Sequence, residues 1–285
     1  MTVPTPAQGQ GRPGQTAALG AAGMATGLQT RGLQTGCHAG GISHRAARLV
    51  TPFYRRYPYK GRMDLFKLDP RGCYSPLEPF FYNRIPKAAN TTIVAALAQH
   101  SSFLCGHQRG EDPKRQFLRP LLLSRRQVDQ LEQDAFVFTF VRNPFSRVLS
   151  AYLDKVGRLR HQGRRFLAWA QRHGQPGDFL GFCRFLDAGG LDLDMHWAPQ
   201  ADILCLPLGR FDFIGRVENL DRDLPKVLKR LFGARAEMPS QRRGTTTNAT
   251  LQLQQIYGPE ERRIIARLYR SDFELFGYAP TLAGP

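Results

Sequence analysis

A loop centred on Lys87 places a cation and two hydroxyl groups at the predicted start of a helix. The apolar run 79–85 before it has the length of a strand, and the alanine-containing run 93–97 after it favours a helix. A helix start has unpaired N–H groups and a partial positive charge, and both stabilise an anion. A solvated loop lysine explains the segment equally well, and no G-x-x-x-x-G-K-[ST] sequence is present.

A second cation, Arg142, ends another predicted strand at 135–141. Asn143 suits the N-cap of a following helix and Pro144 its first position, so Ser150 lies two turns into that helix. Open α/β sheets bind ligands at the carboxyl ends of their strands. Two strand-loop-helix units with cations and hydroxyls therefore predict a ligand with two separate anionic groups.

These segments resemble the two cofactor motifs of carbohydrate (family 2) sulfotransferases, which use 3′-phosphoadenosine 5′-phosphosulfate. The similar patterns are Pro86-Lys87-x-Ala-x-Thr and Arg142-x-Pro-x-x-Arg147-x-x-Ser150-x-Tyr152. Segments 194–200, 211–220 and 268–278 and the residue Cys205 are also similar to parts of that family. The resemblance covers about residues 79–278.

The resemblance implies an α/β fold, in which helices flank a central parallel sheet, of the P-loop-nucleotide-hydrolase-like sulfotransferase type. It also implies transfer of a sulfuryl group to a hydroxyl of a carbohydrate, either a glycan or a glycolipid. The residues expected to hold the 5′-phosphosulfate are Pro86, Lys87, Ala89, Asn90, Thr91 and Thr92. Arg142 and Ser150 are expected to hold the 3′-phosphate. A loop that closes over the nucleotide in the family implies further contacts from Arg242, Arg243 and Thr247, although this chain has threonines where many relatives have a histidine.

For the chemistry, the resemblance places Lys87 where it neutralises charge on the leaving phosphate. His196 is the leading candidate for the base, since an imidazole titrates near neutral pH, and Trp197 beside it is a candidate sugar-stacking wall. A histidine that only bonds a neighbouring loop is an equal alternative, and Glu218 and His107 are other candidate bases. No metal is required, and the sequence has no metal-ligand spacing.

Composition limits the partners. The formal net charge of +17 favours an anionic partner, namely the nucleotide, an acidic carbohydrate acceptor, or nucleic acid bound without sequence specificity. The five scattered cysteines suggest reduced thiols, with a single disulfide left open. No apolar run approaches the ~18 residues of a spanning helix. Because animal members of the family carry a membrane anchor, we expect a soluble, cytoplasmic, bacterial protein, with peripheral membrane contact left open.

Three regions are predicted along the chain: a disordered low-complexity segment at 1–45, a basic aromatic arm and connector at 46–78, and the sulfotransferase domain at 79–280. Helices are expected after Ser124, which begins a capping box, across 178–186 and 219–232, and as one closing helix at 259–276. Pro225 places the start of the third of these near Leu224.

Two other functions fit parts of the sequence. A divergent nucleotide-dependent kinase would need a magnesium-binding carboxylate after a strand, and none is evident. A protein that keeps the nucleotide fold but only binds acidic glycan or nucleic acid would not need Lys87, Arg142 and Ser150 together.

Overall fold

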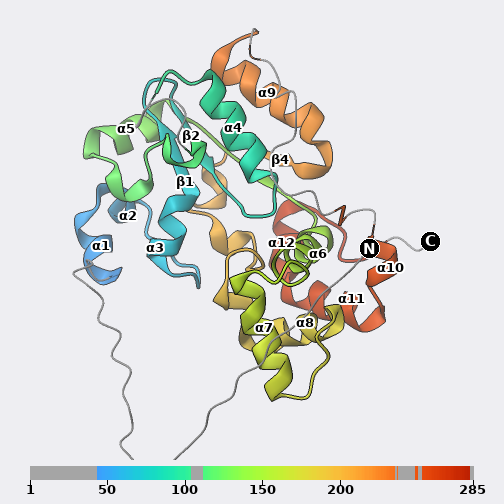
Figure 1. The fold of residues 1–285 in the computed structure, drawn as a ribbon. Helices are drawn as coiled ribbons and strands as arrows, with labels where there is room; N and C mark the ends of the chain where they lie inside the picture. Colours follow the sequence, from blue (N-terminus) through green and yellow to red (C-terminus); the bar gives the residue numbers. More distant parts are fainter. Residues whose placement is uncertain (1–43, 104–111, 235, 237–247, 250–251, 283–285) are drawn as a thin grey trace, which may run out of the picture. The chain divides into compact units, whose positions relative to one another are not determined.

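Four strands form one mixed sheet in the order β1-β2-β3-β4 (Figure 1). The computed structural model describes residues 44–103, 112–234, 236, 248–249 and 252–282. The strands are β1 (Gly72–Ser75), β2 (Phe80–Asn83), β3 (Phe136–Val141) and β4 (Phe213–Arg216). β2, β3 and β4 run parallel, which confirms the predicted strands at 79–85, 135–141 and 211–217 and the α/β class. The carboxyl ends of β2 and β3 therefore lie side by side.

The edge strand β1 pairs antiparallel with β2 and lies within the segment expected to be a connector. Gly72 begins this strand, although a glycine at this point in the sequence favours a connector over a strand. In the structure a side chain at this position would collide with Pro120 and with Phe81. The glycine therefore permits a close approach of chain segments inside a strand.

One face of the sheet is covered by α4 (Asn90–His100) and α9 (Leu220–Phe232), which contact each other (Figure 1). Alternate strand residues such as Phe80 and Phe138 pack into this layer with Ile93 and Leu224. The intervening residues point to the opposite face because successive strand side chains alternate. There they meet α2 (Pro52–Arg56) and α5 (Arg125–Gln133), whose Ser124 capping box is formed as predicted.

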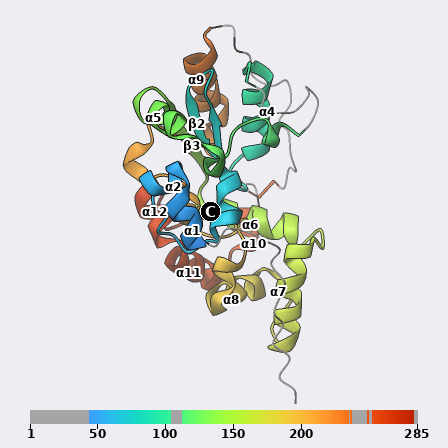
Figure 2. The same cartoon turned by 90° about the vertical axis from the view of Figure 1, so that its left-hand side faces the viewer.

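A second group of helices lies below the sheet in Figure 2 and is built mainly from α6, α7, α8 and α11. The bounds are α6 (Pro144–Lys155), α7 (His161–Arg172), α8 (Phe179–Phe185), α10 (Leu253–Ile256), α11 (Pro259–Leu268) and α12 (Arg270–Phe276). Their shared core contains aromatic side chains from all parts of the group, including Phe145, Phe182, Tyr257 and Phe273. α6 follows β3 directly, so this core holds the segment that carries Arg142.

The predicted arm contributes to the core. It includes α1 (His44–Val50) and α2, and is followed by α3 (Leu65–Leu68). Phe53 and Tyr54 are fully buried, and the Tyr54 hydroxyl donates to Asp69 at 3.1 Å. Residues 42–285 group into one compact unit, so the arm and the sheet share a core. Residues 1–43 of the predicted disordered segment lie outside the described residues.

Two predicted helix boundaries are wrong. α9 begins at Leu220 and continues through Pro225, since the fixed φ of proline suits a helix even though its ring removes one N–H bond and crowds the carbonyl four residues earlier. The expected single helix at 259–276 is interrupted at Tyr269, whose φ of −105° and ψ of 23° are not helical. The Tyr269 hydroxyl donates to the carbonyl of Trp197, so a long-range bond accompanies the break.

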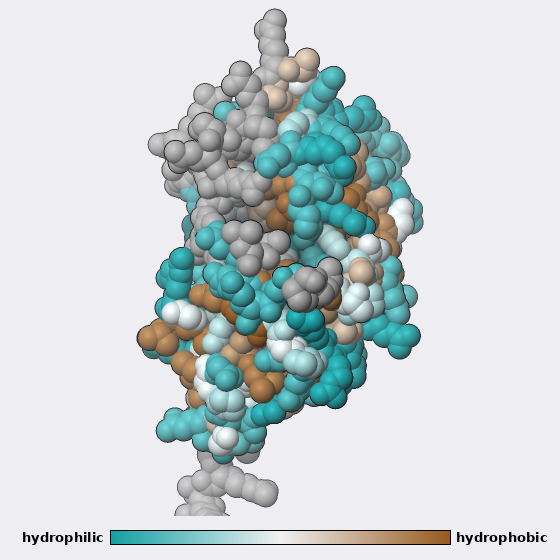
Figure 3. Space-filling model, turned by 90° about the vertical axis from the view of Figure 1, so that its right-hand side faces the viewer, coloured by the Kyte–Doolittle hydropathy of each residue, from teal (hydrophilic) through white to brown (hydrophobic). Residues whose placement is uncertain are grey.

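Figure 3 shows one side on which hydrophilic residues predominate and hydrophobic residues form scattered groups. Across the described ranges, no helix is long and apolar enough to span a membrane. Cys73, Cys183 and Cys205 are buried free thiols, and Cys37 and Cys105 lie outside the described residues.

We expect Phe138→Ala to lower the free energy of unfolding by about 3–5 kcal/mol, since it leaves a cavity in the layer between the sheet and α4. Urea denaturation measures the change. Leu122→Ala is the control, because Leu122 is 54% exposed and its truncation should cost under about 0.5 kcal/mol. Equal losses in the two variants would contradict this account of the core.

Candidate active site

The lysine loop has a strained backbone that faces a cavity. Lys87 and Ala89 have positive φ angles of 66° and 54°, and α4 begins directly after them at Asn90. Each such non-glycine residue costs of the order of 1 kcal/mol, and strain of this kind concentrates at functional sites. The loop therefore adopts a strained conformation that glycines would adopt without strain. This conformation points the start of α4 toward the cavity.

A carboxylate on α6 holds the Lys87 ammonium. Lys87 Nζ lies 3.1 Å from Asp154 Oδ2, and Lys155 Nζ lies 3.1 Å from the same oxygen. Burial lowers the pKa of Lys87, although the charge of Asp154 opposes this effect. Burial alone would raise the pKa of Asp154, but Lys87 and Lys155 outweigh it and hold that pKa below its usual value. The ammonium has three donors, so an anion in the cavity can still be bound by those that Asp154 does not use.

Arg142 joins the second strand end to the lysine loop. Its guanidinium donates to the Lys87 carbonyl at 3.4 Å, and its backbone N–H donates to Gln200 at 2.9 Å. Burial lowers the pKa of Arg142, and the charge of Glu218 partly compensates. The following helix begins as predicted, because the Asn143 side chain accepts from the N–H of Phe145 at 3.0 Å.

His196 forms a pair with Asp194. His196 Nδ1 lies 2.5 Å from Asp194 Oδ1, and Asp194 also accepts from the His196 backbone N–H at 2.9 Å. If Nδ1 donates in this bond, Nε2 of a neutral ring is left as the acceptor. Burial lowers the pKa of His196, Asp194 opposes this, and Lys155 and Arg71 lower it further. The ring is therefore neutral at pH 7 and suited to accept a proton.

One buried arginine connects these parts. Arg147 is fully buried and donates to three backbone carbonyls: Pro86 at 3.0 Å, Ala198 at 2.7 Å and Met195 at 3.0 Å. Two of these carbonyls flank His196, and the third precedes Lys87. Arg147 belongs to the second motif, but motif spacing alone does not show which distant carbonyls its side chain reaches.

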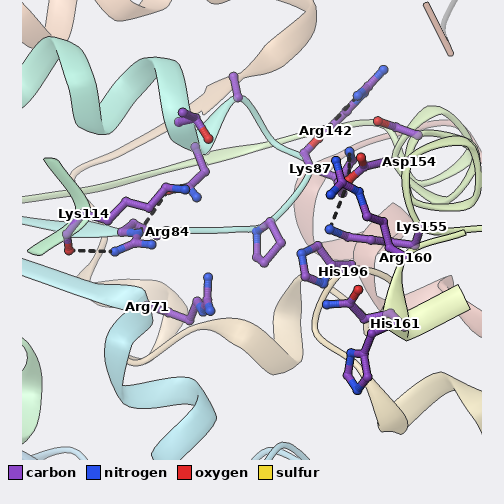
Figure 4. Close-up of a pocket in the computed structure, with 16 residues that line it drawn as sticks. Arg71, Arg84, Lys87, Lys114, Arg142, Asp154, Lys155, Arg160, His161 and His196 are labelled. Atoms are coloured by element: carbon purple, nitrogen blue, oxygen red, sulfur yellow. Dashed lines mark hydrogen bonds and ion pairs between the residues drawn. The ribbon is translucent and has the colours of Figure 1, made fainter. Parts of the chain in front are cut away.

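Lys87, Arg142, Asp154 and His196 line a cavity of about 910 Å³ at the ends of β2 and β3 (Figure 4). Its lining is strongly basic, with Asp154 as the only carboxylate among the lining residues described. The lining residues are Arg71, Arg84, Pro86, Lys87, Ala89, Asn90, Thr91, Lys114, Arg142, Ser150, Asp154, Lys155, Arg160, His161, Gln162 and His196. Such a cavity suits a ligand with several negative charges.

Most of the predicted site residues that the structure describes come together in this cavity. Thr92 is the exception, because it is buried on α4 and does not line the cavity. Arg242, Arg243, Thr247 and His107 lie outside the described residues. The cavity is also lined by Arg71, Arg84 and Lys114, which were not predicted as site residues. They lie in three separate segments, so no sequence pattern connects them.

Two other candidates have structural roles. Trp197 is fully buried, packs against Phe182 and donates to the Gly190 carbonyl at 2.9 Å, so the predicted sugar-stacking wall is wrong. Glu218 does not line the cavity, and it accepts from the N–H of Asn143 at 2.8 Å and from the hydroxyl of Tyr278 at 2.9 Å. His196 is therefore the better placed candidate base.

The described residues contain no cluster of three His, Cys, Asp or Glu side chains that could hold a metal ion.

Comparison with known proteins identifies one family. A sequence profile of the sulfotransferase family matches residues 73–279. Carbohydrate sulfotransferase 14 of Danio rerio is 32% identical over 163 residues, which are 50% of this chain and 44% of that protein. Carbohydrate sulfotransferase 10 of Mus musculus is 29% identical over 171 residues, which are 50% of this chain and 47% of that protein. The alignments thus span less than half the length of these relatives. No solved structure gives a significant match.

We expect Arg147→Met to lower the free energy of unfolding by about 3–5 kcal/mol, because three carbonyls and the nearby Asp272 lose a buried cation. Urea denaturation measures the loss. Arg126→Met is the matched control, since Arg126 is exposed on α5 and its replacement should change stability by under about 0.5 kcal/mol. An unchanged denaturation midpoint for Arg147→Met would show that the three bonds are dispensable.

Proposed function

The chain belongs to the sulfotransferase family, and on that premise we propose that it transfers a sulfuryl group from 3′-phosphoadenosine 5′-phosphosulfate to a carbohydrate hydroxyl. One observation carries the proposal: the two separate cation-and-hydroxyl segments, around Lys87 and Arg142, line a single basic cavity. The names of the relatives, carbohydrate sulfotransferases 14 and 10, support a carbohydrate acceptor.

The cavity residues fit the proposed cofactor. Its two anionic ends require two cationic positions, and Lys87 and Arg142 provide them on neighbouring strand ends. Pro86, Ala89, Asn90 and Thr91 would surround the phosphosulfate, and Ser150 would join Arg142 at the 3′-phosphate. When bound, the cofactor supplies an SO₃ group on a phosphate leaving group.

Lys87 would stabilise the negative charge that develops on the leaving phosphate oxygen. Its ammonium is held by Asp154 at 3.1 Å and so need not be reorganised during the reaction. As in phosphoryl transfer, positioning and charge stabilisation would supply most of the catalysis. Because the Lys87 side chain is largely buried, water screens its interaction with an anion less than it would at the protein surface.

His196 would take the proton of the acceptor hydroxyl. Asp194 fixes the orientation of the ring, and Nε2 is the atom available to the substrate. The proton would pass to Nε2 as the hydroxyl oxygen bonds to sulfur, and the bond between sulfur and the phosphate oxygen breaks. Asp194 would then stabilise the imidazolium that results.

A cytoplasmic, bacterial origin remains a prediction, because the relatives named above are vertebrate proteins. The kinase and the inactive binding protein remain the alternatives, and nucleotide binding and turnover distinguish them. A kinase would prefer ADP, whereas an inactive protein would bind the bisphosphate without transferring sulfate.

We expect adenosine 3′,5′-bisphosphate to bind at least about tenfold more tightly than ADP, because only the bisphosphate has the 3′-phosphate that Arg142 would contact. Arg142→Ala should remove most of this preference, and the exposed-site variant Arg126→Ala should retain it. Isothermal titration calorimetry measures both affinities. Equal affinity of the wild-type protein for the two nucleotides would contradict the proposed cofactor.

We expect His196→Ala to lower kcat about 10²–10⁴-fold, the usual contribution of a general base, with little change in bisphosphate affinity. Turnover is followed with labelled phosphosulfate, and His173→Ala on the exposed end of α7 is the control. Because burial lowers the pKa of His196, the midpoint of the fall in wild-type kcat with acidity should lie below pH ~6.5, the ordinary pKa of a histidine. Full activity of His196→Ala would exclude it as the base.

A further inference from the structure

Arg71 is a cation at the cavity wall whose side chain has no partner among the residues that the structure describes. Its guanidinium makes no hydrogen bond or ion pair with any described residue, and its Nε is shielded from solvent. A buried guanidinium nitrogen without an acceptor is costly, and native proteins seldom tolerate one without a reason. The arrangement indicates that the acceptor for Arg71 arrives with a ligand.

The nearby carboxylates are already engaged. Asp69, two residues earlier, accepts from the N–H of Leu121 at 2.7 Å and lies 3.4 Å from Arg119. Asp194 bonds to His196 at 2.5 Å. Neither carboxylate forms an ion pair with Arg71, so its charge is not neutralised by the described part of the chain.

A second arginine increases this excess of charge. Arg84 is 5% exposed and donates to neutral oxygens, those of the Asn90 side chain at 3.0 Å and the Lys114 backbone at 3.2 Å. Burial and then the charge of Arg84 lower the pKa of Arg71 to about 10, which still leaves it charged at pH 7. The two arginines form a positive wall that has no carboxylate partner in the part of the chain that the structure describes.

Arg71 lies across the cavity from Lys87 and Arg142, whereas Arg84 also donates to Asn90, one of the proposed phosphosulfate contacts. Figure 4 shows Arg71, Arg84 and Lys114 on one side of the cavity and Lys87, Arg142 and His196 on the other. Arg71 is nevertheless close enough to His196 for its charge to lower the pKa of that histidine. A group bound by Arg71 would thus lie near the proposed base, where the acceptor must enter.

We propose that Arg71, supported by the charge of the nearby Arg84, binds an anionic group of the acceptor, either a uronic-acid carboxylate or an existing sulfate ester. This inference rests on the proposed function, since it assigns the acceptor class for the same cavity. A planar guanidinium pairs with both groups through two parallel hydrogen bonds. The anion would supply the missing acceptor of Arg71 and would orient the neighbouring hydroxyl toward His196.

Three tetrasaccharide probes test the proposal: unsulfated chondroitin, carboxyl-reduced chondroitin, and carboxyl-reduced chondroitin sulfate. Calorimetry measures their binding to protein saturated with adenosine 3′,5′-bisphosphate, at 0.15 M salt so that distant charges are screened. The wild-type protein should bind at least one anionic probe about tenfold more tightly than the neutral probe. The anionic probe that is preferred identifies the carboxylate or the sulfate ester as the ligand.

Variants separate this site from the general positive charge. Arg71→Gln should abolish the preference, Arg71→Lys should retain part of it, and Arg126→Gln, with the same loss of charge on the surface, should leave it unchanged. Arg71→Gln should not lower the melting temperature, because it removes an unpaired buried cation, and all variants should keep the wild-type bisphosphate affinity.

Three results would overturn the inference. Equal binding of the three probes by the wild-type protein, or equal effects of Arg71→Gln and Arg126→Gln, would remove the anion site. A loss of bisphosphate affinity in Arg71→Gln would assign Arg71 to the nucleotide instead. Failure of the wild-type protein to bind the bisphosphate would contradict the proposed function itself, whereas bisphosphate binding without anion preference would contradict only the role of Arg71.

Discussion

The hydrogen bonds of the buried Arg147 guanidinium hold the candidate active site together. Its three acceptors are backbone carbonyls on two segments that are remote in sequence, the lysine loop and the turn that contains His196. A guanidinium cannot lose its charge at any ordinary pH, so its burial requires acceptors in fixed places. The position of His196 relative to Lys87 therefore depends on α6, which carries Arg147.

The same helix also arranges the charges that face the cavity. Asp154 on α6 holds both Lys87 and Lys155, while Arg142 precedes the helix and bonds the lysine loop. The cavity keeps many more cations than carboxylates, and their mutual repulsion destabilises the unliganded protein. An anionic ligand would relieve that repulsion. The same charges that lower the stability of the protein would therefore raise its affinity for an anion. The positive φ angles of Lys87 and Ala89 add a further local cost at the same place.

The elements that the sequence predicts correctly depend on local patterns. β2, β3 and β4 are continuous apolar runs, and α5, α6 and α8 begin at capping side chains within three residues of the helix start. The elements that it misses depend on remote contacts. β1 requires Gly72 to lie against Pro120, and the break at Tyr269 coincides with a bond to Trp197. Local propensity contains no information about either partner.

The sequence alone determined the two cation-bearing strand-loop-helix units, the spacing of Arg142 and Ser150 within the second unit, and the family resemblance, because each depends on short-range spacing. Only the tertiary structure decided which side chains face the cavity. It placed Trp197 in the core, directed Arg147 to three carbonyls and exposed Arg71 to the cavity with no partner among the described residues. These outcomes depend on how segments tens of residues apart pack against one another. The type of a residue shows what chemistry its side chain can do, but tertiary packing determines which groups that side chain contacts.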